Sequence, residues 1–119
     1  AMSRRQRQMC IRDSYLTVQI GDSQHIMLDP EYLHYINHSC SPNVFFDTEN
    51  MVLIALRNIE IGEEFTFFYP STEWSMDRGF DCICQSENCL GYIQGAAHLP
   101  LNVLTKYELS DYIKQKLGI

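Results

Sequence analysis

The sequence contains no long hydrophobic run and few basic side chains beyond its first residues. No apolar stretch approaches the roughly 18 residues of a membrane-spanning helix, and the basic N-terminus is not followed by the apolar segment of a secretory signal. Beyond residues 1–14, five basic side chains face fourteen acidic ones, a formal charge of −9. Such an acidic body repels phosphate backbones and attracts lysine-rich peptides. We therefore expect an intracellular protein, cytoplasmic or nuclear, with a basic protein or peptide partner, no direct nucleic acid and no membrane.

With 119 residues, 45% of them hydrophobic, the chain suits one small domain with one core. Its first fourteen residues are polar, carry four arginines and show no hydrophobic periodicity. The stretch Met9–Ser14 resembles a reading frame of a common sequencing-library adapter. We therefore interpret residues 1–14, Cys10 included, as a non-native or disordered segment.

Alternating hydrophobicity predicts a mainly β fold with short helices. The predicted strands are residues 16–20, 24–28, 43–47, 51–57 and 64–69. Of these, residues 43–47 and 51–57 are expected to form a hairpin. A short helix begins at Asp29-Pro30 and carries Ile36. Two more helices are expected at residues 100–107 and 111–117, the last one capped by Ser110 and closed by Gly118.

Four cysteines besides Cys10 have a spacing that favours zinc. One stands alone and three fall within eight residues: Cys40, then Cys82, Cys84 and Cys89. The close spacing of Cys82 and Cys84 is awkward for a mutual disulfide. Three thiolates from one loop and one from a distant segment would complete a closed tetrahedral site, which is structural because it has no open position. The alternative is a set of unrelated thiols, or disulfides in an oxidising compartment.

The polar run Asn37–Asn43 lies between an apolar helix and an apolar strand, where packing does not call for so many hydrogen-bonding groups. It therefore indicates a site. One alternative is a Cys40 nucleophile activated by His38, although the three downstream cysteines favour a ligand role for this thiol. Another is an Asx-and-proline turn in which His38 only satisfies backbone groups.

Three segments together resemble the SET-domain protein-lysine methyltransferases. Asn37–Asn43 resembles the central motif of that family, Gly62–Tyr69 its second motif, and Phe80–Gly91 its cysteine-rich post-SET loop. The resemblance implies a β-clip fold of short strands in which the two motif segments thread through one another like a knot. It covers residues 15–79, the C-terminal portion of a SET domain, and residues 80–91, a post-SET zinc loop. Residues 92–119 match no part of the family pattern and are expected to form a C-terminal helical extension.

The same resemblance implies S-adenosylmethionine-dependent methyl transfer to a protein lysine. Asn37 and His38 would contact the cofactor, Tyr69 would be the catalytic tyrosine, and Phe67 would line the substrate channel and favour higher methylation. The four cysteines, Cys40, Cys82, Cys84 and Cys89, would hold Zn²⁺. Alternatives are a catalytically inactive, zinc-stabilised interaction module of the same fold and an unrelated zinc-binding structural protein.

Some positions depart from the family pattern or have an ordinary structural explanation. Phe68 occupies a position where the family commonly has aspartate, and no two glycines are separated by a single residue, although the family has a Gly-x-Gly turn near its cofactor. We therefore expect an N-terminally truncated copy. Alternate aromatics on a strand usually belong to the core, so Phe65 is expected mainly in the core and Phe67 equally in the core or the channel. Trp74 could face a cation.

Overall fold

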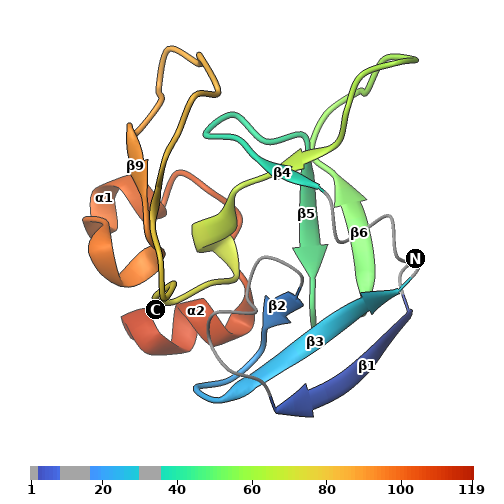
Figure 1. Cartoon of the computed structure of the whole chain (residues 1–119), viewed down its shortest axis with the longest axis vertical. Helices are drawn as coiled ribbons and strands as arrows, with labels where there is room; N and C mark the ends of the chain where they lie inside the picture. Colours follow the sequence, from blue (N-terminus) through green and yellow to red (C-terminus); the bar gives the residue numbers. More distant parts are fainter. Residues whose placement is uncertain (1–2, 9–16, 30–35) are drawn as a thin grey trace.

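The computed structural model describes residues 3–8, 17–29 and 36–119, and short strands dominate it (Figure 1). The strands are β1 (Ser3–Gln8), β2 (Thr17–Gln19), β3 (Gln24–Asp29), β4 (Asn37–His38), β5 (Val44–Asp47), β6 (Val52–Ala55), β7 (Thr66–Phe67), β8 (Phe80–Asp81) and β9 (Tyr92–Ile93). The α-helices are α1 (Leu101–Leu104) and α2 (Asp111–Leu117), and 3-10 turns occupy Tyr69–Ser71 and Ala96–His98. This architecture confirms the predicted mainly β fold with short helices.

An antiparallel sheet in the order β1-β3-β2 forms one end of the molecule (Figure 1). Strands β2 and β3 confirm the two predicted strands around the turn at Gly21. Strand β1 pairs with β3 along its whole length, Ser3 opposite Asp29 and Gln8 opposite Gln24, although we expected no regular structure there. Whether residues 1–14 are native stays a prediction. Cys10 and most of the helix predicted after Asp29 lie outside the described residues.

The predicted hairpin is confirmed: β5 and β6 pair antiparallel, with Val44 opposite Ala55 and Asp47 opposite Val52. Asp47 stabilises its turn, because its carboxylate accepts hydrogen bonds from the backbone N–H groups of Glu49 and Asn50, both at 3.1 Å. The strand predicted at residues 64–69 is shorter than expected. It contains only Thr66 and Phe67, because the chain turns into the 3-10 helix that contains Pro70.

The centre of the fold is a parallel crossing of β4 and β7, two segments far apart in sequence (Figure 1). Asn37 pairs with Thr66 and His38 with Phe67. The buried side chain of Asn43 fixes this crossing: its amide nitrogen donates to the Glu64 carbonyl at 2.8 Å, and its oxygen accepts from the Thr66 N–H at 2.8 Å. A single buried amide from the chain after β4 thereby satisfies two backbone groups of the segment that contains β7.

Two neighbouring phenylalanines leave the crossing on opposite sides and enter different apolar clusters. Phe67 packs with Val18, Val44 and Phe46 of the strands and with Ile36, which precedes β4. Phe68 packs with residues of the C-terminal segment, namely Ala96, Leu104, Leu109, Tyr112 and Ile113, and stacks on Tyr107 with ring centroids 3.7 Å apart. The phenylalanine that departs from the family pattern is therefore the residue against which the chain beyond residue 91 packs.

The C-terminal helices bear out most of what the sequence predicts. The Ser110 side chain accepts a hydrogen bond from the Ile113 N–H at 3.3 Å, and Gly118 ends α2 at φ 76°. Helix α1 is shorter than the predicted 100–107, with α-helical geometry only from Leu101 to Leu104. In the described part of the chain, no helix has the length and apolar character needed to cross a membrane.

Candidate cofactor cleft and metal centre

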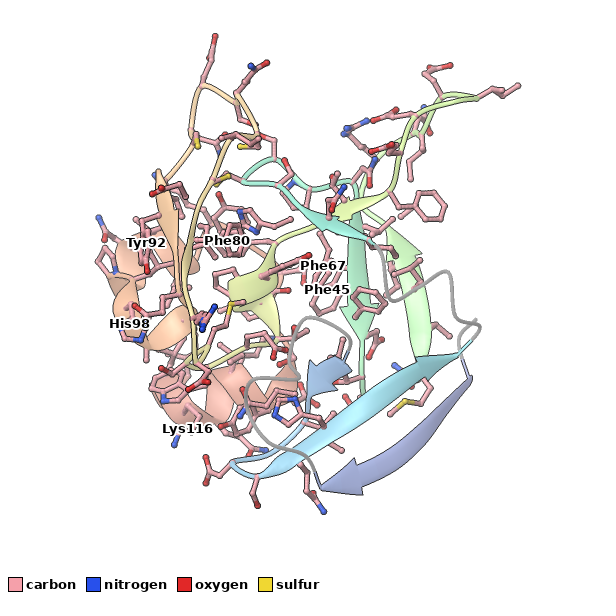
Figure 2. The ribbon with its side chains drawn as sticks, viewed as in Figure 1. Phe45, Phe67, Phe80, Tyr92, His98 and Lys116 are labelled. Atoms are coloured by element: carbon pink, nitrogen blue, oxygen red, sulfur yellow. The ribbon has the colours of Figure 1, made fainter. Side chains whose placement is uncertain are left out.

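The four predicted cysteine ligands come together. The pairing of β8 with β9 closes the loop from Cys82 to Gly91, and this loop meets the chain after β4 (Figure 2). The sulfur atoms of Cys40, Cys82, Cys84 and Cys89 all lie within 4.8 Å of one another, and those of Cys40 and Cys82 are 3.9 Å apart. Tetrahedral zinc with Zn–S bonds of about 2.3 Å places its sulfurs about 3.8 Å apart. None of these four thiols is in a disulfide, so the geometry fits a closed structural zinc site.

The surroundings of the sulfurs also fit a cation. Burial raises the pKa of the Cys40 thiol, whose residue is completely buried, and raises the pKa of Cys82 to about 11. Burial also acts to raise the pKa of Cys84, but hydrogen bonds from the side chain and backbone of Ser86 lower it to about 5. The Leu90 N–H donates to the Cys40 sulfur at 3.3 Å. A metal ion ionises the thiols that it coordinates and supplies the charge that a buried thiolate needs.

The tautomer of His38 follows from its neighbours. Its Nδ1 lies 3.1 Å from the backbone nitrogen of Tyr69, and because a backbone N–H can only donate, Nδ1 is the acceptor. The ring hydrogen is therefore on Nε2, which lies 3.4 Å from the sulfur of Cys40 and donates to it. Burial lowers the pKa of His38 to about 4, so the ring is neutral at pH 7. One imidazole thus links the tyrosine segment to the thiol cluster.

This arrangement argues against the Cys40 nucleophile. An Nε2 that already carries a hydrogen cannot take the proton of the thiol, so His38 is not a general base for Cys40. The thiol is also inaccessible, with 0% of Cys40 exposed. The turn interpretation holds in part, since His38 does satisfy a backbone group, the N–H of Tyr69.

Tyr69 is held at both ends. Its backbone N–H donates to His38, and its hydroxyl donates to the Ile36 carbonyl at 3.0 Å. Its ring lies among other rings, with centroid distances of 5.2 Å to His38, 4.6 Å to Phe67 and 5.7 Å to Phe80. The phenol therefore has a defined position beside the crossing.

A hollow of about 720 Å³ opens beside the crossing, within the usual size of small-molecule sites. It is lined by Asn37, His38, Glu64, Tyr69, Phe80, Asp81, Cys82, Ile83 and Cys84. Three predicted site residues, Asn37, His38 and Tyr69, therefore share one wall with the cysteine loop. We call this hollow the cofactor cleft.

Three aromatic residues lie away from the cofactor cleft. Phe67 is buried against Phe46, with ring centroids 4.7 Å apart, and is not among the described residues that line the cleft. The prediction that Phe65 lies in the core is wrong, because 43% of it is exposed. Trp74 packs against the C-terminal cluster, and the cation over its ring is the protein's own Lys116, 5.3 Å from the centroid.

Sequence reasoning did not single out four of the lining residues, Asp81, Ile83 and, at the edges of their motifs, Glu64 and Phe80. The last two lie inside recognisable motifs, Glu64 two residues after Gly62 and Phe80 two residues before Cys82. Their positions at motif edges were the available signal. Their side chains come to the cleft only because the crossing and the cysteine loop meet there.

Comparison with known proteins places these motifs in one family. The family model for the SET domain matches residues 3–70, more than half of the chain. The methyltransferase flvH of Aspergillus flavus is 42% identical over 109 residues, which are 90% of this chain and 61% of that protein. An H3 lysine-36-specific histone-lysine N-methyltransferase of Saccharomyces cerevisiae is 30% identical over 101 residues, 75% of this chain and 14% of that protein. An H3 lysine-4-specific enzyme of Emericella nidulans is 39% identical over 66 residues, 5% of its length. The chain thus spans only part of each relative.

Proposed function

Because the chain belongs to the SET-domain family, we propose that it takes part in methyl transfer from S-adenosylmethionine to the side-chain amine of a protein lysine. The observation that carries this proposal is the cofactor cleft, where Asn37, His38 and Tyr69 meet the cysteine loop. Bound S-adenosylmethionine would supply an electrophilic methyl group on a sulfonium. The lysine nitrogen forms the new bond to that carbon as the carbon–sulfur bond breaks, and the nitrogen then loses a proton. Such an in-line displacement requires alignment and exclusion of water rather than a strong base at the reacting carbon.

We assign the cofactor contacts to Asn37 and His38, in different ways. Asn37 is exposed at the cleft and can offer its side-chain amide. Both ring nitrogens of His38 are already engaged, with Tyr69 and with Cys40. Its polar contribution to the cofactor therefore comes from its main chain, and its ring serves to hold the neighbouring segments.

Tyr69 is the proposed catalytic residue. Its hydroxyl donates to the Ile36 carbonyl, and a phenol oxygen that donates one hydrogen bond can also accept one, in this proposal from the lysine amine. Phe67, packed 4.6 Å from the Tyr69 ring, has no hydroxyl to hold a water there. In this proposal Phe67 does not line the cofactor cleft itself but borders the lysine channel beside the Tyr69 ring, and it leaves room for higher methylation. The four cysteines hold Zn²⁺, whose role is structural.

The substrate that suits the chain is a lysine in a basic protein. The formal charge of the whole chain is −6, and opposite charge speeds encounter with a cationic segment. The relatives named above as histone-lysine N-methyltransferases act on H3 lysines, by their names. A histone tail or another basic protein of the nucleus or cytoplasm is therefore the proposed partner.

Two measurements test the proposal. Calorimetry should detect S-adenosylmethionine binding, weakened by Asn37→Ala, and radiolabelled methyl groups should transfer to a lysine-rich protein pool. Tyr69→Phe should lower transfer by roughly a hundredfold while retaining bound zinc and cofactor affinity. The matched control is Tyr92→Phe, a half-exposed tyrosine outside the cleft.

The alternative is a catalytically inactive, zinc-stabilised interaction module. An N-terminal portion with a Gly-x-Gly turn, taken from a relative, provides the decisive comparison. If neither the chain alone nor the chain with this portion binds S-adenosylmethionine, the inactive module is preferred. If the extended chain binds and transfers methyl groups, the sequence-based expectation of a truncated copy is supported.

A further inference from the structure

A second groove lies between the β5–β6 hairpin and the chain from Thr105 to Lys114. It consists of adjoining hollows of about 430 and 340 Å³, which share Phe45, Leu56 and Glu108. None of its lining residues lines the cofactor cleft in the described part of the chain. We call it the hairpin–tail groove, after the β5–β6 hairpin and the C-terminal tail, residues 92–119. It is not required by the proposed methyl transfer, so its presence calls for a separate explanation.

The hairpin side of the groove includes accessible apolar side chains. Ile54 and Leu56 are each 39% exposed, although both are large hydrophobic side chains. They follow one another at alternate positions at the end of the hairpin, so they face the groove together. A pair of adjacent exposed apolar side chains beside polar walls is typical of a surface that contacts a partner.

A buried polar atom in the same groove has no partner. Ser71 lines the larger hollow and is only 2% exposed. Its hydroxyl is the one buried side-chain oxygen or nitrogen of the described residues without a hydrogen bond. Buried hydroxyls are nearly always paired in folded proteins. A ligand atom in the groove would satisfy this hydroxyl, and the main chain of a peptide offers both donors and acceptors.

The charges along the groove favour a cationic ligand. The hairpin side carries Asp47 and Glu49, the opposite side carries Glu108 and Asp111, and the cations are Lys106 and Lys114. Glu49 and Asp111 both line the smaller hollow, where interaction with Asp111 raises the pKa of Glu49 and the charge of Lys114 acts to lower it. An added ammonium or guanidinium between these two acids would offset the repulsion between their charges.

We propose that the hairpin–tail groove binds an extended basic peptide, with a lysine or arginine between Glu49 and Asp111 and an apolar side chain on Ile54 and Leu56. The main chain of the peptide runs toward Ser71 and forms a hydrogen bond with the Ser71 hydroxyl. This mode gives affinity through apolar contact and selectivity through charge. Binding at this groove is independent of S-adenosylmethionine and of methyl transfer.

Fluorescence anisotropy tests the proposal directly. The probe is a short fluorescein-labelled peptide of lysine, leucine and alanine, compared with a counterpart in which glutamate replaces lysine. The lysine peptide should bind and the glutamate peptide should not. The double variant Glu49→Gln/Asp111→Asn should raise the Kd for the lysine peptide roughly tenfold, and Ser71→Ala and Leu56→Ser should each raise it by a smaller factor.

The matched control removes two exposed acids outside the groove, in Glu60→Gln/Asp77→Asn, and should leave the Kd within about twofold. Circular dichroism verifies that each variant is folded. The proposal is overturned by equal weakening in both double variants, by no binding of the lysine peptide, or by equal binding of the glutamate peptide. The Kd should be unchanged in Tyr69→Phe and without S-adenosylmethionine, so failure of methyl transfer is distinguishable from failure of the groove.

Discussion

The β4–β7 crossing and the cysteine loop contribute adjacent walls of the same cleft, but they are stabilised differently. The crossing is stabilised by ordinary hydrogen bonds, including the 2.8 Å contacts that the Asn43 side chain makes with Glu64 and Thr66. The loop from Cys82 to Gly91 has few backbone bonds, such as Cys82 N–H to Gly91 carbonyl at 2.7 Å, and its thiols face one another. We therefore expect the crossing to fold on its own contacts and the loop to depend on a cation.

Removal of metal should produce the largest difference in stability between the crossing and the cysteine loop. Because zinc binding of order 10 kcal/mol is coupled to local folding, chelation should unfold residues 82–91 while the crossing keeps its amide protection. Hydrogen exchange and limited proteolysis measure both regions in one sample. Equal protection of the loop before and after chelation would show that it does not depend on metal.

The packing of the C-terminal segment on the crossing is tested at Phe68. Phe68→Ala should lower the free energy of unfolding by about 3–5 kcal/mol, because it leaves a cavity beneath Tyr107. The matched control is Phe65→Ala, at a position that is 43% exposed, which should cost less than about 1 kcal/mol. Urea denaturation gives both values. Similar losses in the two variants would contradict the assigned packing.

The crossing itself is tested at Asn43. Asn43→Ala leaves the Glu64 carbonyl and the Thr66 N–H without partners, so stability should fall by about 2–3 kcal/mol. Asn50→Ala, in the exposed turn of the hairpin, is the control and should cost less than about 1 kcal/mol. If Asn43→Ala is no worse than Asn50→Ala, the crossing does not rely on this amide.

Glu73 connects the turn after Tyr69 to β2, and its burial predicts that the stability of the fold depends on pH. Burial raises the pKa of Glu73 to about 8, and its carboxylate accepts hydrogen bonds from the Gln19 N–H and the Thr72 hydroxyl, both at 2.9 Å. Between the unfolded pKa of about 4.5 and the folded value of about 8, the native state binds a proton that the unfolded chain releases. The unfolding free energy should therefore fall as pH rises through this window, by about 1.4 kcal/mol per pH unit at most.

Glu73→Gln supplies the control for this effect, because glutamine resembles the protonated acid and does not titrate. The difference in stability between the two proteins should change with pH from 5 to 8 in urea denaturation. A constant difference would mean that Glu73 has an ordinary pKa in the folded state.

Local patterns in the sequence predicted the parts of the fold that depend on local contacts. The β5–β6 hairpin and the Ser110 cap of α2 were predicted because alternation and capping operate over a few residues. The helix predicted at residues 100–107 was too long, and the strand predicted at 64–69 ends early because of the turn at Pro70. Propensity alone does not fix where such elements end.

Tertiary contacts decided what the sequence could not. Strand alternation places Phe67 and Phe68 on opposite faces, but it cannot show that both faces are covered, since the cover on Phe68 arrives with residues 96–113. The meeting of Cys40 with the downstream thiols was predicted from ligand chemistry and the family resemblance. The bonds of His38 to Tyr69 and Cys40 were beyond prediction, because they depend on the register of two strands.

The stack of Phe68 on Tyr107 has a consequence for how such proteins diverge. The Tyr107 hydroxyl also donates to the Cys40 carbonyl at 2.7 Å, so this one ring is joined both to the aromatic at position 68 and to the segment that carries the first thiol. We therefore expect homologues with an aromatic residue at position 68 to retain the C-terminal tail, and homologues with aspartate there to tolerate its loss.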